Sequence, residues 1–158
     1  CNLEIVKLGA LLHDIADSKF NDGDETIGPK IARKFLEKEK VKKEEIDHVV
    51  AIIENISFKG GNFEKSFYSK ELEIVQDADR IDAIGAIAIA RAFAYGGAMN
   101  RKIYEEGSAE CSIAHFYDKL LLLKEKMNTK TVKKIAENRH IYMETFLQQF
   151  YNEWEGNL

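Results

Sequence analysis

Two adjacent residues near the start of the chain, His13 and Asp14, have side chains of the kinds that bind divalent metal ions. They stand at the end of an apolar helical segment, where a charge is costly unless it is paired or coordinates a metal. Adjacent residues point about 100° apart on a helix, so both reach one ion only if it lies off the helix shoulder. Mixed imidazole and carboxylate ligation suits Mg²⁺ or a divalent first-row cation. Asp17 lies one turn beyond His13 on the same side. The alternative is an ordinary helix C-terminus with a solvated histidine.

A second acidic cluster lies in the stretch QDADRID, directly before the most apolar segment of the chain, and contains Asp77, Asp79 and Asp82. Two structural explanations are open. The acids can be favoured by the dipole at the N-terminus of the following helix, or Arg80 can pair with one of them. Both clusters are short acidic breaks in otherwise apolar helices, so we consider them together as one candidate site.

The hydrophobic pattern around both clusters has a helical period. The spacing of Ile5, Leu8, Leu12 and Ile15 places these four side chains on one helix face. Further helices are predicted from near Pro29 to Lys40, from Glu44 to Asn55, after Ser69 as N-cap to Gln76, and from Asn128 or Thr129 to near Gly156.

The segment AIGAIAIARAFAY, residues 83–95, is apolar on nearly all sides, which predicts a buried helix. Gly96 and Gly97 are expected to stop it, and Ser112 is expected to cap the next helix after a loop. No segment alternates with period two, and the chain has one proline. The sequence therefore predicts an all-α fold, a bundle of about six or seven helices that forms a single domain over residues 1–158.

The two clusters resemble the signature of a known family. A His-Asp pair followed about 65 residues later by an Asp between Ala and Arg resembles the HD superfamily of metal-dependent phosphohydrolases. The stretches DADRIDAIGAIAIARAFAYGG and HFYDKLL are similar to small stand-alone members of the YedJ/YpgQ type, over essentially the whole chain. The resemblance implies the HD-domain fold, with His13, Asp14 and Asp79 holding one divalent metal (Mn, Mg, Fe, Co, Ni or Zn). Asp79 is preferred to Asp77 because the family motif places its ligand between a small residue and Arg or Lys.

The family also uses a first histidine on an upstream helix, for which this sequence has no counterpart. Residue 1 is Cys rather than Met, and residues 1–14 already read as a helix in progress. We therefore expect the displayed chain to begin inside the native protein, without its N-terminal helix. No signal peptide is recognisable at this end.

The resemblance implies hydrolysis of a phosphate ester or phosphoanhydride in a nucleotide-like small molecule. Asp17 resembles an acidic residue used by ppGpp hydrolases of the superfamily, which makes it the candidate general base or water-orienting residue. The alternative is a surface acid in a turn. Arg91 is expected on the same helix face as Asp79. The candidates for binding the phosphate are Lys19, Arg80, Arg91, His115 and Lys119, of which the last two are one helical turn apart.

Two alternatives stay open. A phosphodiesterase for cyclic nucleotides would need two metals and a further ligand, with His48 as the best candidate. A noncatalytic regulatory module would keep the fold with a degenerate metal site. His140, in the last helix, is most simply structural.

Composition narrows the partners. The chain has 158 residues and a formal net charge of −4, which disfavours stable nucleic-acid binding. No apolar run is long enough to span a bilayer. Cys1 and Cys111 have no metal-binding spacing and are expected to be free thiols in a reducing cytoplasm. The expected partner is a small phosphorylated molecule, and association into a homo-oligomer is left open.

Overall fold

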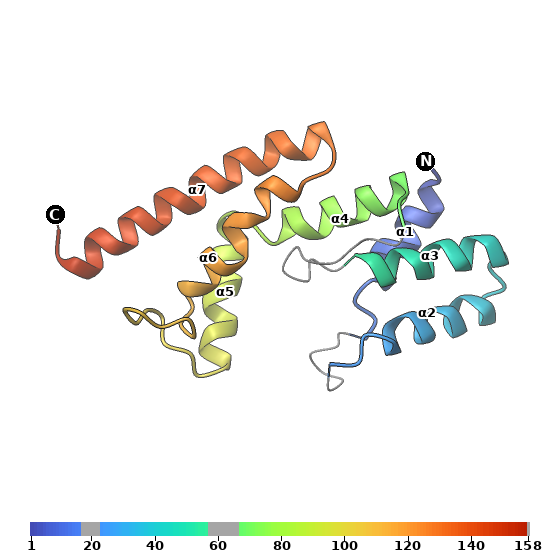
Figure 1. The fold of residues 1–158 in the computed structure, drawn as a ribbon, viewed down its shortest axis with the longest axis horizontal. Helices are drawn as coiled ribbons and strands as arrows, with labels where there is room; N and C mark the ends of the chain where they lie inside the picture. Colours follow the sequence, from blue (N-terminus) through green and yellow to red (C-terminus); the bar gives the residue numbers. More distant parts are fainter. Residues whose placement is uncertain (17–22, 57–66, 158) are drawn as a thin grey trace. The chain divides into compact units, whose positions relative to one another are not determined.

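The computed structural model of the chain describes residues 1–16, 23–56 and 67–157. These residues contain seven α-helices and no strand, which confirms the predicted all-α fold (Figure 1). The α-helices are α1 (Leu3–Leu12), α2 (Ile27–Lys38), α3 (Lys43–Asn55), α4 (Lys70–Asp82), α5 (Ala86–Ala98), α6 (Ala114–Asp118) and α7 (Lys130–Glu155), and two 3₁₀ helices, η3 (Leu120–Leu122) and η4 (Lys124–Lys126), precede α7.

The chain divides into two compact units, Cys1–Ala78 and Asp79–Leu158. Helix α4 starts in the first unit, and its last turn belongs to the second. That the two units form a single domain stays a prediction from the sequence.

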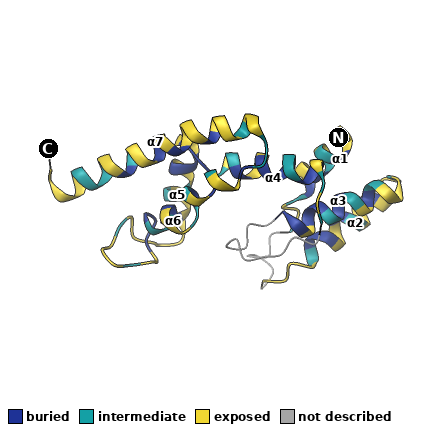
Figure 2. Cartoon of the chain, turned by 45° about the horizontal axis from the view of Figure 1, so that its top comes forward, coloured by how far each residue is buried: buried dark blue, intermediate teal, exposed yellow. Residues whose placement is uncertain are grey.

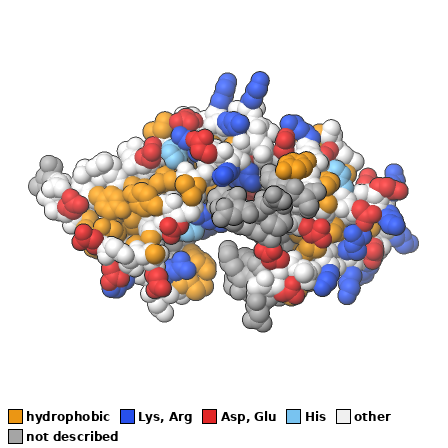
Figure 3. All heavy atoms as spheres, in the orientation of Figure 1, with side chains coloured by type: hydrophobic (Ala, Val, Ile, Leu, Met, Phe, Trp, Pro, Cys, Tyr) orange, Lys and Arg blue, Asp and Glu red, His pale blue; other side chains and the backbone are white. Residues whose placement is uncertain are grey.

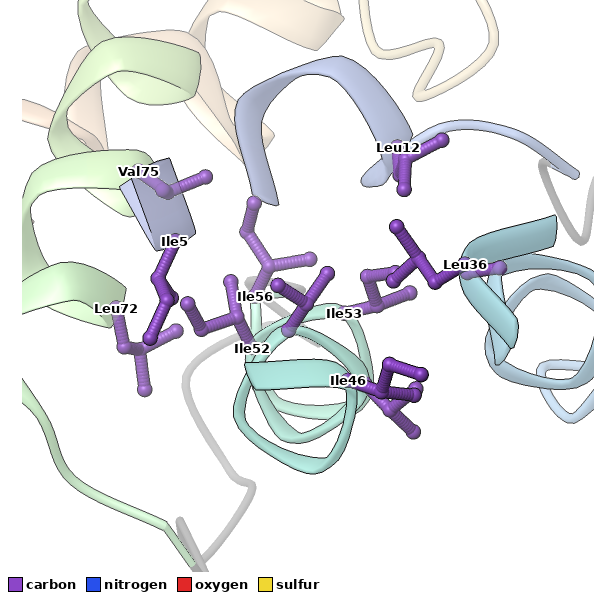
Figure 4. Close-up of a cluster of buried hydrophobic side chains, with 12 residues drawn as sticks. Ile5, Leu12, Leu36, Ile46, Ile52, Ile53, Ile56, Leu72 and Val75 are labelled. Carbon is purple, nitrogen blue, oxygen red and sulfur yellow. The ribbon is translucent and has the colours of Figure 1, made fainter. Parts of the chain in front are cut away.

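The first unit is built around α3, which packs against both α1 and α2. Its buried face carries Ile46, Val49, Val50, Ile52 and Ile53, at the spacing of an amphipathic helix. Figure 4 shows Ile52 and Ile53 of α3 among apolar side chains from the neighbouring helices. The contributors from α1, α2 and α4 are Ile5, Leu12, Ala32, Leu36, Leu72 and Val75.

Helix α1 approaches α3 and α4 closely at Gly9. A Cβ atom at Gly9 would lie 3.3 Å from Cγ2 of Val75 and 3.4 Å from Cγ2 of Ile52, so a larger side chain would force these neighbours to move. The expected apolar face of this helix is only partly confirmed. Ile5 and Leu12 are buried, whereas α1 ends at Leu12 and Ile15 lies beyond it, 36% exposed.

The start of α1 is tied to α4 by polar contacts. The Asn2 side chain caps α1 by accepting from the amides of Glu4 and Ile5. The backbone N–H of Asn2 donates to Oε1 of Glu71 at 2.6 Å. That bond is the main reason why the pKa of the Glu71 carboxyl lies below its ordinary value, although burial acts in the opposite direction.

The second unit has an aromatic core. Phe93 on α5 packs against Phe116 on α6 and Phe146 on α7, each with ring centroids 5.8 Å from those of Phe93. Phe116 is fully buried. The buried residues of α7 are Ala136, His140, Met143 and Leu147, whose spacing defines one face of this long helix (Figure 2).

The prediction that residues 83–95 form a buried helix is wrong in part. A helix does form, but it starts at Ala86, and Ile87 is 79% exposed and Tyr95 45% exposed. Most of its other residues are alanines, whose small side chains expose little apolar surface, so one side can pack in the unit while the other faces outward. Figure 3 shows hydrophobic side chains at the surface of this unit.

The predicted end of α5 and the predicted cap of the next helix are also wrong. The helix continues through Gly96 and Gly97 to Ala98, and Asn100 then turns the chain with φ +55°. Gly96 is required by close packing instead, because a Cβ there would lie 2.1 Å from Oγ of Ser112. Ser112 is therefore buried against α5. The N-cap residue of α6 is Ile113, and the amide of Ala114 donates to Sγ of Cys111 at 3.4 Å.

Other predicted boundaries are confirmed. Oγ of Ser69 accepts from the amide of Leu72 at 3.0 Å and caps α4. Pro29 lies in the first turn of α2. Thr129 is the N-cap residue of α7, and Gly156 ends that helix with φ +73°. No single helix among the described residues is long and apolar enough to cross a membrane; only α4 and α5, counted together as a bent pair, meet the length and composition required.

The core of the first unit can be tested with two identical substitutions. Leu36 on α2 is 1% exposed and Leu11 on α1 is 79% exposed. Leu36→Ala should lower the free energy of unfolding by about 2–5 kcal/mol, because it removes buried apolar surface and leaves a cavity. Leu11→Ala should change it by less than about 0.5 kcal/mol. Urea denaturation measures both, and equal losses would contradict the packing described.

The contact between Asn2 and Glu71 predicts a pH dependence. Because folding lowers the pKa of Glu71, its contribution to stability is present above the ordinary glutamate pKa of about 4.3 and is lost as the pH falls through the lowered value. Glu71→Gln should destabilise the protein at pH 7 and flatten the decline of the unfolding free energy on acidification. Glu54→Gln, at an exposed position on α3, should leave that decline unchanged. Equal slopes for the wild type and Glu71→Gln would contradict the assignment.

Candidate metal centre

His13 is the C-cap residue of α1, and a backbone contact orients its ring. Nδ1 lies 2.8 Å from the carbonyl oxygen of Ala10, one turn earlier. In the neutral ring this bond places the proton on Nδ1 and leaves the lone pair on Nε2. Metal-binding histidines commonly hold their second ring nitrogen in this way.

Asp14 places a carboxylate next to that lone pair. Its Oδ2 lies 3.3 Å from Nε2 of His13, and the side chain of Asp14 is 74% exposed while that of His13 is 22% exposed. A lone pair on nitrogen and a carboxylate oxygen this close repel each other unless a proton or a metal cation lies with them. The donor set, one imidazole nitrogen with carboxylate oxygens, fits a divalent first-row cation or Mg²⁺.

Asp17 and Lys19, the predicted base and one predicted phosphate ligand, lie outside the described residues. Their predicted roles therefore stay predictions from the sequence.

The second acidic cluster was expected at the N-terminus of a helix, but the structure places it at the C-terminus of α4. Asp77, Asp79 and Asp82 occupy the last two turns of α4, and the next helix starts only at Ala86. The explanation that the acids favour a helix N-terminus is wrong, because the C-terminal end of a helix carries partial negative charge. Carboxylates at this end are unfavourable unless positive groups lie near them.

The three aspartates differ in exposure. Asp77 is 1% exposed, whereas Asp79 and Asp82 are exposed. Asp82 pairs with Arg91 of α5, with Nη1 of Arg91 2.6 Å from Oδ2 of Asp82. Asp79 lies on the exposed side of the last turn of α4, and its choice as the metal ligand stays a prediction from the sequence.

Within residues 1–16, 23–56 and 67–157, no three side chains of His, Cys, Asp or Glu form a group that could hold a metal ion. His13 and Asp14 belong to the first unit and Asp79 is the first residue of the second, so neither unit contains all three predicted ligands. The set of three ligands stays a prediction from the sequence.

Two of the predicted phosphate ligands have structural contacts. Arg80 is buried and its Nη1 donates to the carbonyl oxygen of Lys126 in η4. The prediction that Arg91 shares a helix face with Asp79 is wrong, because the helix breaks between Asp82 and Ala86. Arg91 reaches back over that break to Asp82 instead.

His115 and Lys119 do not form the joint helical face that their spacing predicts. Helix α6 ends at Asp118, and Lys119 adopts φ −140° and ψ −59°, outside the helical region. Its backbone N–H still donates to the carbonyl oxygen of His115 at 3.1 Å. Both side chains are partly exposed, so their predicted role in phosphate binding stays open to experiment.

His48, the candidate ligand for a second metal, lies against α4. Its Nε2 is 3.0 Å from Oγ of Ser69 and 3.6 Å from Oε2 of Glu71, and its ring packs edge-on to Phe67. These contacts give His48 a structural role between α3 and the start of α4. His140 is buried, with Nε2 3.3 Å from Oε1 of Glu144 on the same helix.

One residue of the site region was missed by the sequence analysis. Arg139 on α7 donates through Nη1 to the carbonyl oxygens of Ile81 and Ile84, at the break between α4 and α5. Arg139 lies 58 residues from Ile81 in the sequence and has no motif around it, so its contact with Ile81 is seen only in the folded structure.

Comparison with known proteins identifies close relatives. The family model described as HD domain matches residues 1–84. YpgQ of Bacillus subtilis is 41% identical over 158 residues, which cover 98% of this chain and 75% of YpgQ. The crystal structure of an HD-superfamily hydrolase from Bacillus thuringiensis matches with a TM-score of 0.75 and 46% identity, over 98% of this chain and 75% of that one. A crystal structure of YpgQ in complex with ADP matches with a TM-score of 0.78 and 37% identity, over 97% of this chain and 78% of YpgQ.

The geometry of His13 predicts that it is a metal ligand. His13→Gln should weaken Mn²⁺ binding by at least about 10- to 100-fold, because loss of even an outer partner of a ligand has that effect. Isothermal titration calorimetry measures the affinity. His48→Gln is the matched control in the same unit and should leave affinity and stoichiometry unchanged. A loss of Mn²⁺ binding on His48→Gln alone would move the metal to His48 and Glu71.

Proposed function

The chain belongs to the HD family of metal-dependent phosphohydrolases, and from this premise we propose that it hydrolyses a phosphate ester or phosphoanhydride in a nucleotide-like small molecule. The observation that carries the proposal is the pairing at the end of α1, where the oriented imidazole of His13 lies beside the carboxylate of Asp14. Support for a nucleotide comes from the relative YpgQ, which has been crystallised in complex with ADP.

A bound divalent cation would supply two things, a water molecule acidified toward neutral pH and a polarised phosphoryl oxygen. His13, Asp14 and Asp79 are the residues proposed to hold it. The hydrogen bond from Nδ1 of His13 to the carbonyl oxygen of Ala10 fixes the ring, so that Nε2 is the nitrogen left to bind the cation.

The reaction needs a water oxygen to form a bond to phosphorus while the bond from phosphorus to the leaving oxygen breaks. The water gives up a proton, and the leaving oxygen gains one. Asp17 is the proposed base, by the family resemblance. Positive charge for the phosphate is proposed to come from Lys119 and His115, both partly exposed in the second unit.

The alternative with two metals would take His48 from its contacts with Ser69 and Glu71, and it stays a prediction from the sequence. The noncatalytic module would bind metal without turnover, and an activity assay separates it from the hydrolase. Mono-, di- and triphosphates of several nucleosides, offered with Mn²⁺, are the appropriate probes. Release of orthophosphate indicates a phosphatase, and release of pyrophosphate indicates a pyrophosphohydrolase.

Asp79→Ala should lower kcat/KM on the best of these nucleotides by at least about 100-fold, because the metal loses a ligand. Circular dichroism should show the helical signal of the wild type, since the side chain is exposed. Glu125→Ala, at an exposed carboxylate of the same unit, should leave kcat/KM unchanged. Full turnover by Asp79→Ala would place the reaction elsewhere, and no turnover of any nucleotide by metal-loaded wild type would favour the noncatalytic module.

A further inference from the structure

The terminal carbonyl groups of α4 accept hydrogen bonds from one backbone amide and two arginine side chains. A helix leaves its last four carbonyl groups without partners inside the helix. The backbone N–H of Ala83 serves two of them, lying 3.3 Å from the oxygen of Asp79 and 3.2 Å from that of Arg80. The other two are served by arginine side chains. Arg139 donates to the oxygen of Ile81, and Nη2 of Arg91 donates to the oxygen of Asp82 at 3.1 Å.

Arg139 also packs across the break between the helices. Its Nη1 lies 3.5 Å from the oxygen of Ile84, the residue before Gly85. Gly85 has φ +97°, and a Cβ atom there would lie 3.0 Å from Cγ and 3.1 Å from Cδ of Arg139. Gly85 therefore leaves room for the arginine stem and also permits the backbone turn.

The positive charge of Arg139 also offsets negative charge at the end of α4. The last turn of α4 carries the carboxylates of Asp79 and Asp82 on the negative end of the helix dipole. The guanidinium groups of Arg91 and Arg139, which donate to carbonyl oxygens of this end, offset both sources of negative charge. Arg91 donates to the carboxylate and the carbonyl oxygen of Asp82. Arg139 donates to the carbonyl oxygen of Ile81, two residues after Asp79.

We propose that Arg139 is a positioning residue for the metal ligand Asp79. By holding the carbonyl oxygens of Ile81 and Ile84, it keeps the last turn of α4 wound, and this turn carries the carboxylate of Asp79. Helix ends fray when their terminal groups lose partners, so without Arg139 the carboxylate is spread over several positions. This inference rests on the proposed function, in which Asp79 binds the cation.

The cavity beside Arg139 makes a rescue experiment possible. It has a volume of about 370 Å³ and is lined by Gly85, Ile87, Asn138, Arg139 and Tyr142 among others. In Arg139→Ala, a guanidinium ion from solution can enter the space left by the side chain and donate to the same carbonyl oxygens. Methylammonium carries the same charge without the planar fork of donors.

The experiment measures Mn²⁺ affinity of the full chain by calorimetry. Arg139→Ala should weaken binding by about 10- to 100-fold, and millimolar guanidinium should restore most of it while methylammonium should not. Arg101→Ala removes an arginine of the same unit that lies over the ring of Tyr95, and should leave the affinity unchanged. In the background of Asp79→Ala, the further change Arg139→Ala should cost nothing more, because both act on the same ligand.

Each other result overturns the inference or its premise. Unchanged affinity in Arg139→Ala, or a loss that adds in full to that of Asp79→Ala, would show that Arg139 does not act through Asp79. If Asp79→Ala itself leaves Mn²⁺ affinity unchanged, the proposed metal site fails instead. Should Arg139→Ala not fold, Gly85→Ala provides the second test, since its new Cβ displaces the arginine stem. It should weaken Mn²⁺ binding, and full affinity in that variant would overturn the proposal.

Discussion

The second unit depends on how positive charge is supplied to the end of α4. That helix finishes with a run of carboxylates where its own dipole is already negative, and with terminal carbonyl groups that need donors. Three arginines lie at this end. Arg80 reaches the carbonyl oxygen of Lys126, Arg91 reaches Asp82, and Arg139 reaches Ile81 and Ile84. Each guanidinium joins the end of α4 to a different later segment, so the charges that make the acidic cluster tolerable also attach it to η4, α5 and α7.

The end of α1 follows a different principle, because its chemistry is local. His13 is oriented by a carbonyl group from its own helix, and its neighbour Asp14 supplies the carboxylate. The apolar residues Ile5 and Leu12 of α1 anchor this pair, since both are buried in the core of the first unit. A close approach at Gly9 fixes the distance of α1 from α3 and α4. Packing therefore places the end of α1, and one backbone hydrogen bond selects the tautomer that a metal ligand needs.

The helix boundaries that were predicted correctly from the sequence depend on residues close to one another along the chain. The cap by Ser69, the start of α7 at Thr129 and its end at Gly156 all depend on the residue types found within one turn of the helix end. The failures lie where packing between distant segments decides. Gly96 serves contact with Ser112 rather than a helix end, and periodicity could not show this because both roles favour glycine. The break at residues 83–85 was missed because the residues on both sides form helices, and Gly85 alone signals the turn. Arg139 could not be predicted at all, since its partners are more than fifty residues away.

The arginines at the end of α4 also bear on how a phosphate is recognised. Arg91 was expected to bind phosphate, yet two of its donors are committed to Asp82, one to the carboxylate and one to the carbonyl oxygen. A guanidinium has five N–H donors in a fixed fork, so such a contact leaves some donors and the positive charge available. A phosphate could share that charge, but taking the donors themselves would release Asp82 and the end of α4 with it. Arg91 therefore has a structural role at the end of α4. Which side chains contact a phosphate directly stays a prediction from the sequence, with Lys119 and His115 among the candidates.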